Sequence, residues 1–191
     1  MNTAGLILAA GESKRMGSPK ALLDFRGETF LDRLIAVFSQ FCAPVVVVVG
    51  HDAAQIQSGV KNPERVVFAE NKDYRLGQFS SMQCGLRAVP ECAGGVLFTL
   101  VDHPNVRPST VEALLDHPAL LAIPSFQGRR GHPIYFHHDL IAEFLALPPD
   151  SQAKLVVNRH TADIRYAEVD DPGILSDIDD PAAYRRLLET A

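Results

Sequence analysis

The chain has 191 residues with a formal net charge of −5, 47% hydrophobic residues and 21% charged residues. This composition is ordinary for one globular domain, and it excludes a general nucleic-acid binder, which presents a broad basic surface. Every apolar run is far shorter than the roughly 20 residues that cross a bilayer. We therefore expect a single domain over residues 1–191, located in the cytoplasm, with neither nucleic acid nor membrane as a partner.

Apolar strand-like runs alternate with helical stretches along the chain, which is typical of a mostly parallel sheet with helices on both faces. The expected strands cover residues 5–9, 45–49, 66–68, 96–101, 120–123, 134–136 and 164–168. One helix is expected from Thr29 to about residue 41. Three more are expected to begin after residue 52, near 78–81 and at 109, and the last three to cover 140–147, 154–159 and 181–188. Thr29 is a suitable N-cap for the first helix, and Asp179 or Asp180 for the last.

The segment after the first expected strand combines glycines with positive charge. Gly11 and Gly17 permit a positive φ and close approach of the backbone to a ligand, while Lys14, Arg15 and Lys20 supply cations. The spacing excludes a P-loop, because five residues separate the two glycines and Ser-Pro-Lys follows, and the dinucleotide fingerprint G-x-G-x-x-G is absent. The segment is predicted to bind phosphate; the alternative is a solvated basic loop edge.

The strand over residues 96–101 ends at Asp102. Ligands of open α/β sheets bind beyond the carboxyl ends of the strands, so Asp102 and Gly11 are expected at the same edge. A hard carboxylate at a strand end suits Mg²⁺ that bridges phosphate oxygens. The alternative interpretation of Asp102 is a turn cap before Pro104.

Five segments in a fixed order carry a family resemblance that covers nearly the whole chain. They are Leu8-Ala9-Ala10-Gly11-x-Ser13-x-Arg15-Met16-Gly17-x-x-Lys20, Gly77-Gln78-Phe79-Ser80-Ser81-Met82, Val101-Asp102-His103-Pro104, Arg130-Gly131-His132-Pro133 and Asp177-Ile178-Asp179-Asp180-Pro181. Together they resemble the MobA-like NTP transferases of the nucleotide-diphospho-sugar transferase superfamily, most closely the molybdenum cofactor cytidylyltransferases. The resemblance implies a Rossmann-like three-layer α/β/α fold with a mostly parallel mixed sheet.

The same resemblance implies where a nucleoside triphosphate binds. The triphosphate is assigned to the glycine loop and Lys20, and the base to the end of the first strand; the implied nucleotide-binding residues are Leu8, Ala9, Ala10, Gly11, Ser13, Lys14, Arg15, Lys20, Asn71, Ser80 and Ser81. For Ser80 and Ser81 helix capping is an alternative, and for Asn71 a turn. The related guanylyltransferases usually have glycine where this chain has Ala10, so the extra methyl group favours CTP.

Catalysis is assigned to Arg15, Lys20 and Asp102, because nucleotidyl transfer needs cations and a metal against crowded phosphate charge. The resemblance points to the segment with Asp179 as the second Mg²⁺ ligand, and helix capping is the alternative for that residue. Acceptor binding is assigned to His103, Gly131 and His132. The family more often has glutamine in place of His103.

The resemblance therefore implies a Mg²⁺-dependent enzyme that transfers CMP from CTP to the phosphate of molybdenum-bound molybdopterin and releases pyrophosphate. The acceptor phosphate is already anionic near neutral pH, so no general base is required. A molybdoenzyme or its maturation chaperone is the implied protein partner. Two alternatives stay open, namely a sugar or polyol phosphate as acceptor, and a maturation factor that binds nucleotide or molybdopterin without turnover.

Overall fold

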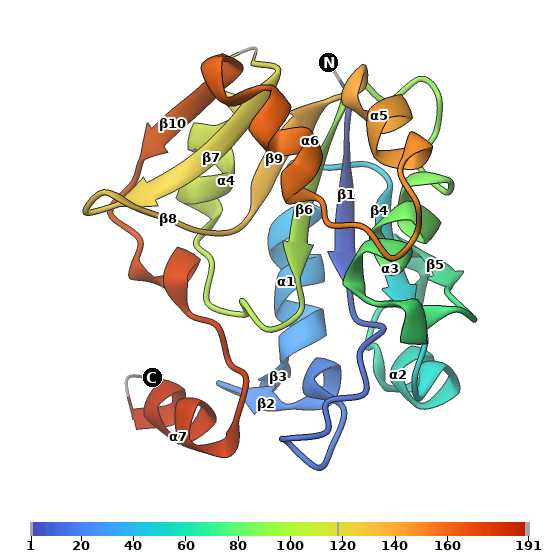
Figure 1. Cartoon of the computed structure of the whole chain (residues 1–191). Helices are drawn as coiled ribbons and strands as arrows, with labels where there is room; N and C mark the ends of the chain where they lie inside the picture. The colour runs from blue at the N-terminus through green and yellow to red at the C-terminus, as the bar shows by residue number, and fades with distance from the viewer. Residues whose placement is uncertain (1, 118, 190–191) are drawn as a thin grey trace.

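The computed structural model describes residues 2–117 and 119–189, and an eight-stranded sheet forms its centre (Figure 1). The strands are β1 Thr3–Leu8, β4 Val45–Val49, β5 Val66–Glu70, β6 Gly95–Leu100, β7 Leu121–Phe126, β8 Arg129–Arg130, β9 Ile134–His137 and β10 Ile164–Glu168. Their order is β10-β7-β9-β6-β1-β4-β5, with β8 beside β7. β9 is antiparallel to β6 and β7, and β8 to β7, whereas the remaining pairs are parallel. The expected mostly parallel mixed sheet is confirmed.

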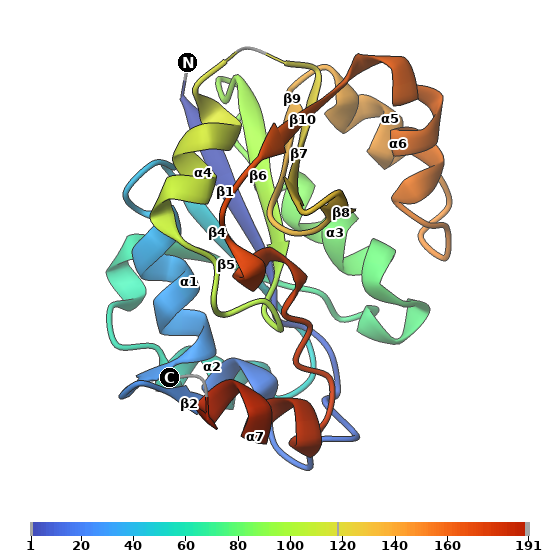
Figure 2. The same cartoon turned by 90° about the vertical axis from the view of Figure 1, so that its left-hand side faces the viewer.

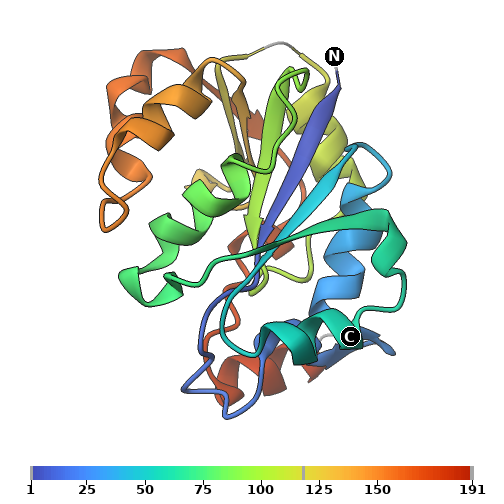
Figure 3. The ribbon, with the colours of Figure 1, turned by 90° about the vertical axis from the view of Figure 1, so that its right-hand side faces the viewer.

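Helices cover both faces of the sheet, as Figures 2 and 3 show from opposite sides. They are α1 Phe30–Phe38, α2 Ala53–Gly59, α3 Gln78–Leu86, α4 Pro108–Leu115, α5 Leu140–Ala146, α6 Lys154–Arg159 and α7 Pro181–Glu189. α1 and α4 lie on one face, and α3, α5 and α6 lie on the other (Figure 2). A separate two-stranded ribbon, β2 Asp24–Phe25 with β3 Glu28–Thr29, precedes α1. The short 3₁₀ turns are η1 Lys20–Leu22, η2 Pro63–Arg65, η3 Tyr74–Leu76, η4 Thr161–Asp163 and η5 Pro172–Leu175.

Alternation along the buried central strands builds two cores. Ile7 and Val47 pack in the cluster that contains the apolar side of α1, whereas Leu6 and Val48 pack in the cluster that contains α3. Successive strand side chains point to opposite faces, so one continuous apolar run serves both layers. Gly85 in α3 lets the helix approach closely, because a Cβ there would lie 2.3 Å from a methyl of Leu6.

The helix caps follow the sequence closely. Thr29 Oγ1 accepts a hydrogen bond of 3.0 Å from the Asp32 N–H, which confirms the predicted N-cap of α1. That helix ends at Phe38 rather than near 41, because the next residues form a tight turn. At α7, Asp180 Oδ1 accepts a 2.8 Å bond from the Ala183 N–H, so Asp180 provides the cap and leaves the Asp179 carboxylate to the site.

Two tertiary connections bring distant segments to the carboxyl edge of the sheet. β1 and β6 are parallel neighbours, and Leu8 pairs in register with Leu100, so the glycine loop and Asp102 emerge side by side. The chain after β10 returns to the same edge, where the Ile178 N–H donates to the Asp102 carbonyl at 3.0 Å. The residues on either side of Ile178 are Asp177 and Asp179.

Candidate active site

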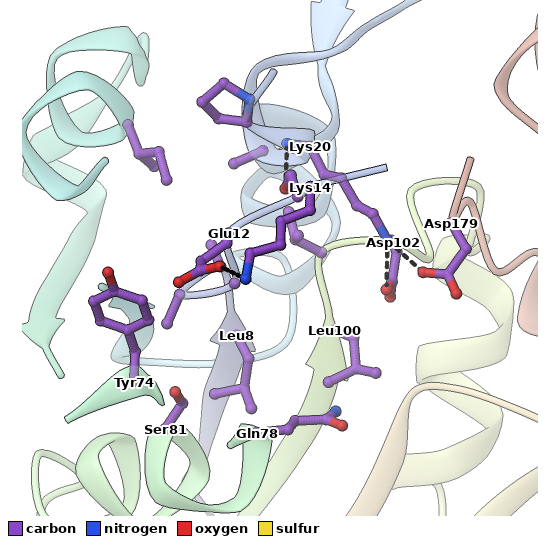
Figure 4. Close-up of a pocket in the computed structure, with 18 of the residues that line it drawn as sticks. Leu8, Glu12, Lys14, Lys20, Tyr74, Gln78, Ser81, Leu100, Asp102 and Asp179 are labelled. Carbon is purple, nitrogen blue, oxygen red and sulfur yellow. Dashed lines mark hydrogen bonds and ion pairs between the residues drawn. The ribbon is translucent and has the colours of Figure 1, made fainter. Parts of the chain in front are cut away.

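A cavity of about 460 Å³ opens at the carboxyl edge of β1 and β6 (Figure 4). The glycine loop forms one wall, the region around the start of α3 forms a second, and Asp102 with Asp179 forms a third. The lining residues are Leu8, Ala9, Ala10, Gly11, Glu12, Ser13, Lys14, Arg15, Pro19, Lys20, Ala21, Ile56, Tyr74, Gly77, Gln78, Ser81, Leu100, Val101, Asp102 and Asp179. Most residues assigned to the nucleotide therefore meet at one cavity, and so do all three assigned to catalysis.

A turn centred on Ser13 shapes the loop. Its carbonyl accepts from the N–H groups of Met16 at 2.9 Å and Gly17 at 3.2 Å, and its hydroxyl accepts from the Lys20 N–H at 3.1 Å. Gly17 has the expected positive φ, at +70°. Gly11 does not use the positive φ that glycine permits, and Ser13 takes the left-handed conformation instead, with a φ of 49°.

The loop presents a row of unpaired backbone donors. Within the described ranges, the backbone N–H groups without a hydrogen-bond acceptor include those of Gly11, Glu12, Ser13, Lys14 and Arg15. Successive free N–H groups in a turn favour the binding of anions, because each contributes a partial positive charge. A Cβ on Gly11 would lie more than 4 Å from every protein atom outside its two chain neighbours. The space beside this residue is therefore open to a ligand.

Each of the three loop cations is paired with a carboxylate. Lys14 Nζ lies 2.5 Å from Glu12 Oε2, and Arg15 Nη2 lies 2.5 Å from Asp179 Oδ2. Lys20 Nζ lies 2.5 Å from Asp179 Oδ1 and 3.4 Å from Asp102 Oδ2. The hydrogen bond from Lys20, and then the one from Arg15, lowers the pKa of Asp179, although partial burial opposes them. Asp179 is therefore ionised at neutral pH.

Three carboxylates converge at the edge of this cavity. Oxygens of Asp102, Asp177 and Asp179 all lie within 4.8 Å of one another. Asp102 Oδ1 is buried and has no hydrogen-bond partner among the described residues. Burial and the nearby charges of Asp102 and Asp179 raise the pKa of Asp177. A cluster of oxygen donors with an unsatisfied buried oxygen fits a hard divalent cation such as Mg²⁺ or Mn²⁺.

Asn71, Ser80 and Ser81 form one hydrogen-bonded group under the cavity. Asn71 Nδ2 donates to Ser80 Oγ at 2.9 Å and to Ser81 Oγ at 3.0 Å, while its Oδ1 accepts from the Asp73 N–H at 3.0 Å. Only Ser81 of these three lines the cavity, and Ser80 Oγ lies 2.8 Å from the Gly77 carbonyl that it bonds. Asn71 and Ser80 therefore hold the α3 N-terminus, and Ser81 keeps its hydroxyl hydrogen for another partner.

Two of the three residues assigned to the acceptor, His103 and His132, pack together beside Asp102. The His103 and His132 rings have centroids 4.8 Å apart, and His103 Nε2 lies 3.8 Å from Asp102 Oδ1. Burial lowers the pKa of both histidines to about 4, so both imidazoles are neutral at pH 7. Gly131 packs against backbone, since a Cβ there would lie 2.1 Å from the Ile174 carbonyl oxygen. It therefore serves close packing of the segment that leads to Asp177.

A second cavity of about 480 Å³ adjoins the first, and Gln78 lines both. Its walls are mainly apolar, and its polar groups come from His132, Lys154 and their neighbours. The lining residues are Gln78, Phe79, Met82, Phe98, His132, Ile134, Ser151, Gln152, Ala153, Lys154 and Val157. His132 also contacts His103, so this cavity is linked to Asp102 through the two rings.

Several residues of the site were not assigned a role from the sequence, among them Gln78, Asp177, Glu12 and Tyr74. Gln78 belongs to one of the five family segments, but only the serines after it were assigned a role, because hydroxyl groups at a helix N-terminus can bind an anion. Asp177 lies two residues before Asp179 in another such segment. Glu12 and Tyr74 line the first cavity, and no sequence signal pointed to either of them.

Fold and site together define a nucleotidyltransferase of the Rossmann-like α/β class. The chain belongs to the MobA-like NTP transferase family, whose domain model matches residues 5–164. It is 27% identical over 185 residues to a molybdenum cofactor cytidylyltransferase from Escherichia coli, covering 92% of this chain and 90% of that protein. It is 29% identical over 197 residues to a nicotine blue oxidoreductase from Paenarthrobacter nicotinovorans, covering 96% and 95%.

Further similarity extends to a longer protein and to solved structures. The chain is 35% identical over 121 residues to the bifunctional protein GlmU from Bifidobacterium animalis, and that match spans only 26% of GlmU. The crystal structure of Rv0371c from Mycobacterium tuberculosis is 27% identical, has a TM-score of 0.83, and the match covers 99% of this chain and 98% of that one. A manganese complex of Rv0371c has a TM-score of 0.78 at 25% identity, with both chains covered fully at 100%. No helix in the described residues is long and apolar enough to cross a bilayer.

Proposed function

We propose that the protein transfers CMP from CTP to the phosphate of molybdenum-bound molybdopterin and releases pyrophosphate. The observation that carries this proposal is the meeting of Lys20 and Arg15 with Asp102 and Asp179 at one cavity. Such a set can bind a metal-chelated triphosphate, because the cations pair with phosphate oxygens and the carboxylates with the metal.

The reaction balances as a substitution at the α-phosphorus. An acceptor phosphate oxygen forms the new bond, the bond from the α-phosphorus to the α,β-bridging oxygen breaks, and pyrophosphate leaves with that electron pair. Lys20 and Arg15 would stabilise the charge that grows on the phosphate oxygens, and the free loop N–H groups would hold the triphosphate in position. Asp102 and Asp179, with Asp177 beside them, would hold Mg²⁺, which would neutralise further phosphate charge.

Base recognition would fall to the inner wall of the first cavity. Ala10 is buried there. Compared with a glycine at this position, its methyl group reduces the space available to a guanine. The Ser81 hydroxyl can donate to an acceptor atom of the base, since Asn71 already donates to its oxygen. These features favour CTP over GTP.

The acceptor would occupy the second cavity, which supports a flat ring system over a small sugar phosphate. Phe79, Met82 and Phe98 provide apolar surface for a ring, and His132 provides a neutral imidazole. Gln78 lies at the boundary with the nucleotide cavity, so the acceptor phosphate can reach the α-phosphorus from this side. A cavity of about 480 Å³ has room for a pterin with its side chain.

One similar protein bears the name of an oxidoreductase, although the family model that matches this chain is that of an NTP transferase domain. Hydride transfer needs no cluster of carboxylates facing lysine and arginine, whereas transfer from a metal-bound triphosphate does. The cluster of Asp102, Asp177 and Asp179 beside Lys20 therefore favours nucleotidyl transfer.

The test uses the full chain with Mg²⁺, CTP or GTP, and molybdenum-loaded molybdopterin, and measures pyrophosphate release together with the dinucleotide product. Release with CTP and this acceptor, faster than with GTP, supports the proposal. Release only with sugar or polyol phosphates would replace the acceptor and keep the reaction. Tight binding of CTP or molybdopterin without pyrophosphate release from any acceptor would identify a maturation factor. Consumption of a reduced nicotinamide cofactor without pyrophosphate release would identify an oxidoreductase.

A matched variant separates the acceptor cavity from the nucleotide cavity. His132→Phe keeps a flat ring but removes the ring nitrogens, so we expect a rise in the KM for the acceptor of about tenfold with little change in the KM for CTP. An equal rise for both substrates would show that the second cavity does not hold the acceptor. The product, if formed, would pass to a molybdoenzyme or its chaperone in the cytoplasm.

A further inference from the structure

The Lys20 ammonium occupies the carboxylate cluster itself. Its Nζ lies 2.5 Å from Asp179 Oδ1 and 3.4 Å from Asp102 Oδ2, and its side chain is only 12% exposed. The dashed contacts in Figure 4 show it between these two side chains. Arg15 also contacts Asp179, but its side chain is 66% exposed and it touches neither of the other two carboxylates.

A cation is required at this position by electrostatics. Three carboxylates whose oxygens lie within 4.8 Å of one another repel strongly unless a positive charge lies among them. Lys20 supplies the compensating charge with its partly buried ammonium.

The ammonium and a divalent metal compete for the same oxygens. Mg²⁺ binds oxygen ligands at about 2.0–2.1 Å and brings two positive charges. An ammonium hydrogen-bonded to Asp179 and Asp102 uses oxygens that the metal needs, and its charge repels the metal. A metal that uses Asp102 Oδ2 and Asp179 Oδ1 therefore requires Lys20 to leave these two oxygens.

Lys20 is built to move while its backbone stays fixed. The Ser13 hydroxyl accepts the Lys20 N–H at 3.1 Å and η1 begins at this residue, so the Cα is held in place. Its four-carbon side chain is flexible, and its head carries three donors without a fixed direction. The row of free N–H groups from Gly11 to Arg15 lines the same cavity, so the ammonium can turn toward a triphosphate held there.

We propose that Lys20 is an exchangeable counter-ion of the metal site. A divalent cation displaces its ammonium from Asp102 and Asp179, and the displaced ammonium binds phosphate oxygens of the incoming nucleotide. Metal alone must separate an ion pair without giving Lys20 a new partner, so it binds weakly. Metal with a nucleoside triphosphate gives Lys20 that partner, so the two ligands bind cooperatively. The proposal rests on the proposed binding of a triphosphate, and it is independent of the acceptor.

The first experiment measures Mn²⁺ binding to the full chain without nucleotide, by the loss of the free Mn²⁺ signal in electron paramagnetic resonance. We expect Lys20→Met to bind Mn²⁺ about tenfold or more tightly than the unchanged protein, because the competing charge is gone. Lys61→Met is the control, since Lys61 donates to the Gly27 carbonyl and lines neither cavity, and its Mn²⁺ affinity should stay within about twofold. Adding Asp102→Asn to Lys20→Met should abolish the gain.

The second experiment adds a CTP analogue with a methylene group between its α- and β-phosphates, which cannot be cleaved. In the unchanged protein the analogue should raise the Mn²⁺ affinity about tenfold or more, and Mn²⁺ should raise the analogue affinity by the same factor. In Lys20→Met most of this coupling should disappear. Lys20→Arg, which keeps the charge, should keep weak binding of metal alone, and it also serves if the methionine variant fails to fold.

Unchanged or weaker Mn²⁺ binding by Lys20→Met would overturn the proposal, and so would the absence of Mn²⁺ binding by both proteins. Full coupling between Mn²⁺ and the analogue in Lys20→Met would overturn the exchange of partners. None of these measurements contains an acceptor. A protein that shows the exchange but releases no pyrophosphate would therefore contradict the proposed function alone.

Discussion

The two segments that build the site differ in how they are held. The glycine loop, residues 11–20, carries all its cations on one short stretch and is shaped by the local turn around Ser13. The acidic segment, residues 171–180, carries carboxylates but is held by contacts with distant parts of the chain. Asp171 is 2% exposed and accepts from the Arg107 N–H at 2.9 Å and from Thr110 Oγ1 at 2.6 Å.

Further contacts continue this anchoring toward the site. The His132 N–H donates to the Ile174 carbonyl at 3.0 Å, and the Ile178 N–H donates to the Asp102 carbonyl at 3.0 Å. The position of Asp179 relative to Lys20 therefore depends on packing between β6, β9 and the chain after β10. The loop that carries the cations is therefore shaped locally, while the carboxylates opposite it are positioned by tertiary structure.

The largest effect is expected from the carboxylate that links both halves. Asp102→Asn keeps the size of the side chain but removes the charge that contacts Lys20 and the metal, so we expect kcat to fall about 10³-fold in a pyrophosphate-release assay. Asp116→Asn, at an exposed position, should leave kcat unchanged. A loss smaller than about tenfold for Asp102→Asn would show that the metal site lies elsewhere.

The anchor of the acidic segment gives the next effect. Asp171→Ala leaves the donors of Arg107, Thr110 and Gly173 unpaired, so we expect the free energy of unfolding in urea to fall by about 3 kcal/mol. Mn²⁺ affinity should fall as well, because Asp179 loses its support. The exposed neighbour offers a matched control, Asp170→Ala, with a change below about 0.5 kcal/mol. Equal effects of the two variants would contradict the anchoring role.

The neutral histidine pair predicts a pH dependence of stability. The native pKa of His132 is about 4, below its ordinary value of 6.5, because the ring is buried. Between these values the unfolded chain binds a proton that the native protein does not, so stability falls as pH falls from 6.5 toward 4. From pH 7 to pH 5 each such histidine costs about 2 kcal/mol of unfolding free energy.

His132→Gln tests this dependence, because it removes one of the two titrating rings. We expect its loss of stability between pH 7 and pH 5, measured by urea unfolding, to be about 2 kcal/mol smaller than that of the unchanged protein. His117→Gln, at an exposed position, should show the full loss. If His132→Gln loses as much stability between pH 7 and pH 5 as the unchanged protein, then the His132 ring is protonated in the native state over this range.

The smallest effect concerns a local element outside both segments. Thr29→Ala removes the side-chain cap of α1, so we expect about 1 kcal/mol of stability to be lost. Differential scanning calorimetry measures the loss, and Mn²⁺ affinity should remain unchanged because the cap touches neither segment. A change in Mn²⁺ affinity would show that the N-terminus of α1 also helps to position the metal site.

Local chemistry in the sequence determined most of the architecture. Buried valine runs, the Thr29 cap and the glycine-rich loop each specify their element through neighbours only a few residues away, so the strands, the helices and the presence of a loop after β1 were predictable. The alternation of strands and helices predicted parallel pairing, which in turn predicted that Asp102 would meet the loop. Family segments in a fixed order added Asp179, and the structure places it against Lys20 and Arg15.

Tertiary structure alone decided the rest. The proximity of Asp177 to Asp102, the contact between the His103 and His132 rings and the cavity beyond Gln78 each involve residues from distant parts of the chain. The sequence showed which side chains were charged, but it did not show that Lys20 would lie among the carboxylates. Backbone hydrogen bonds between distant segments set those positions, and no local periodicity records them, because a side chain's neighbours across a sheet depend on the packing of the whole domain.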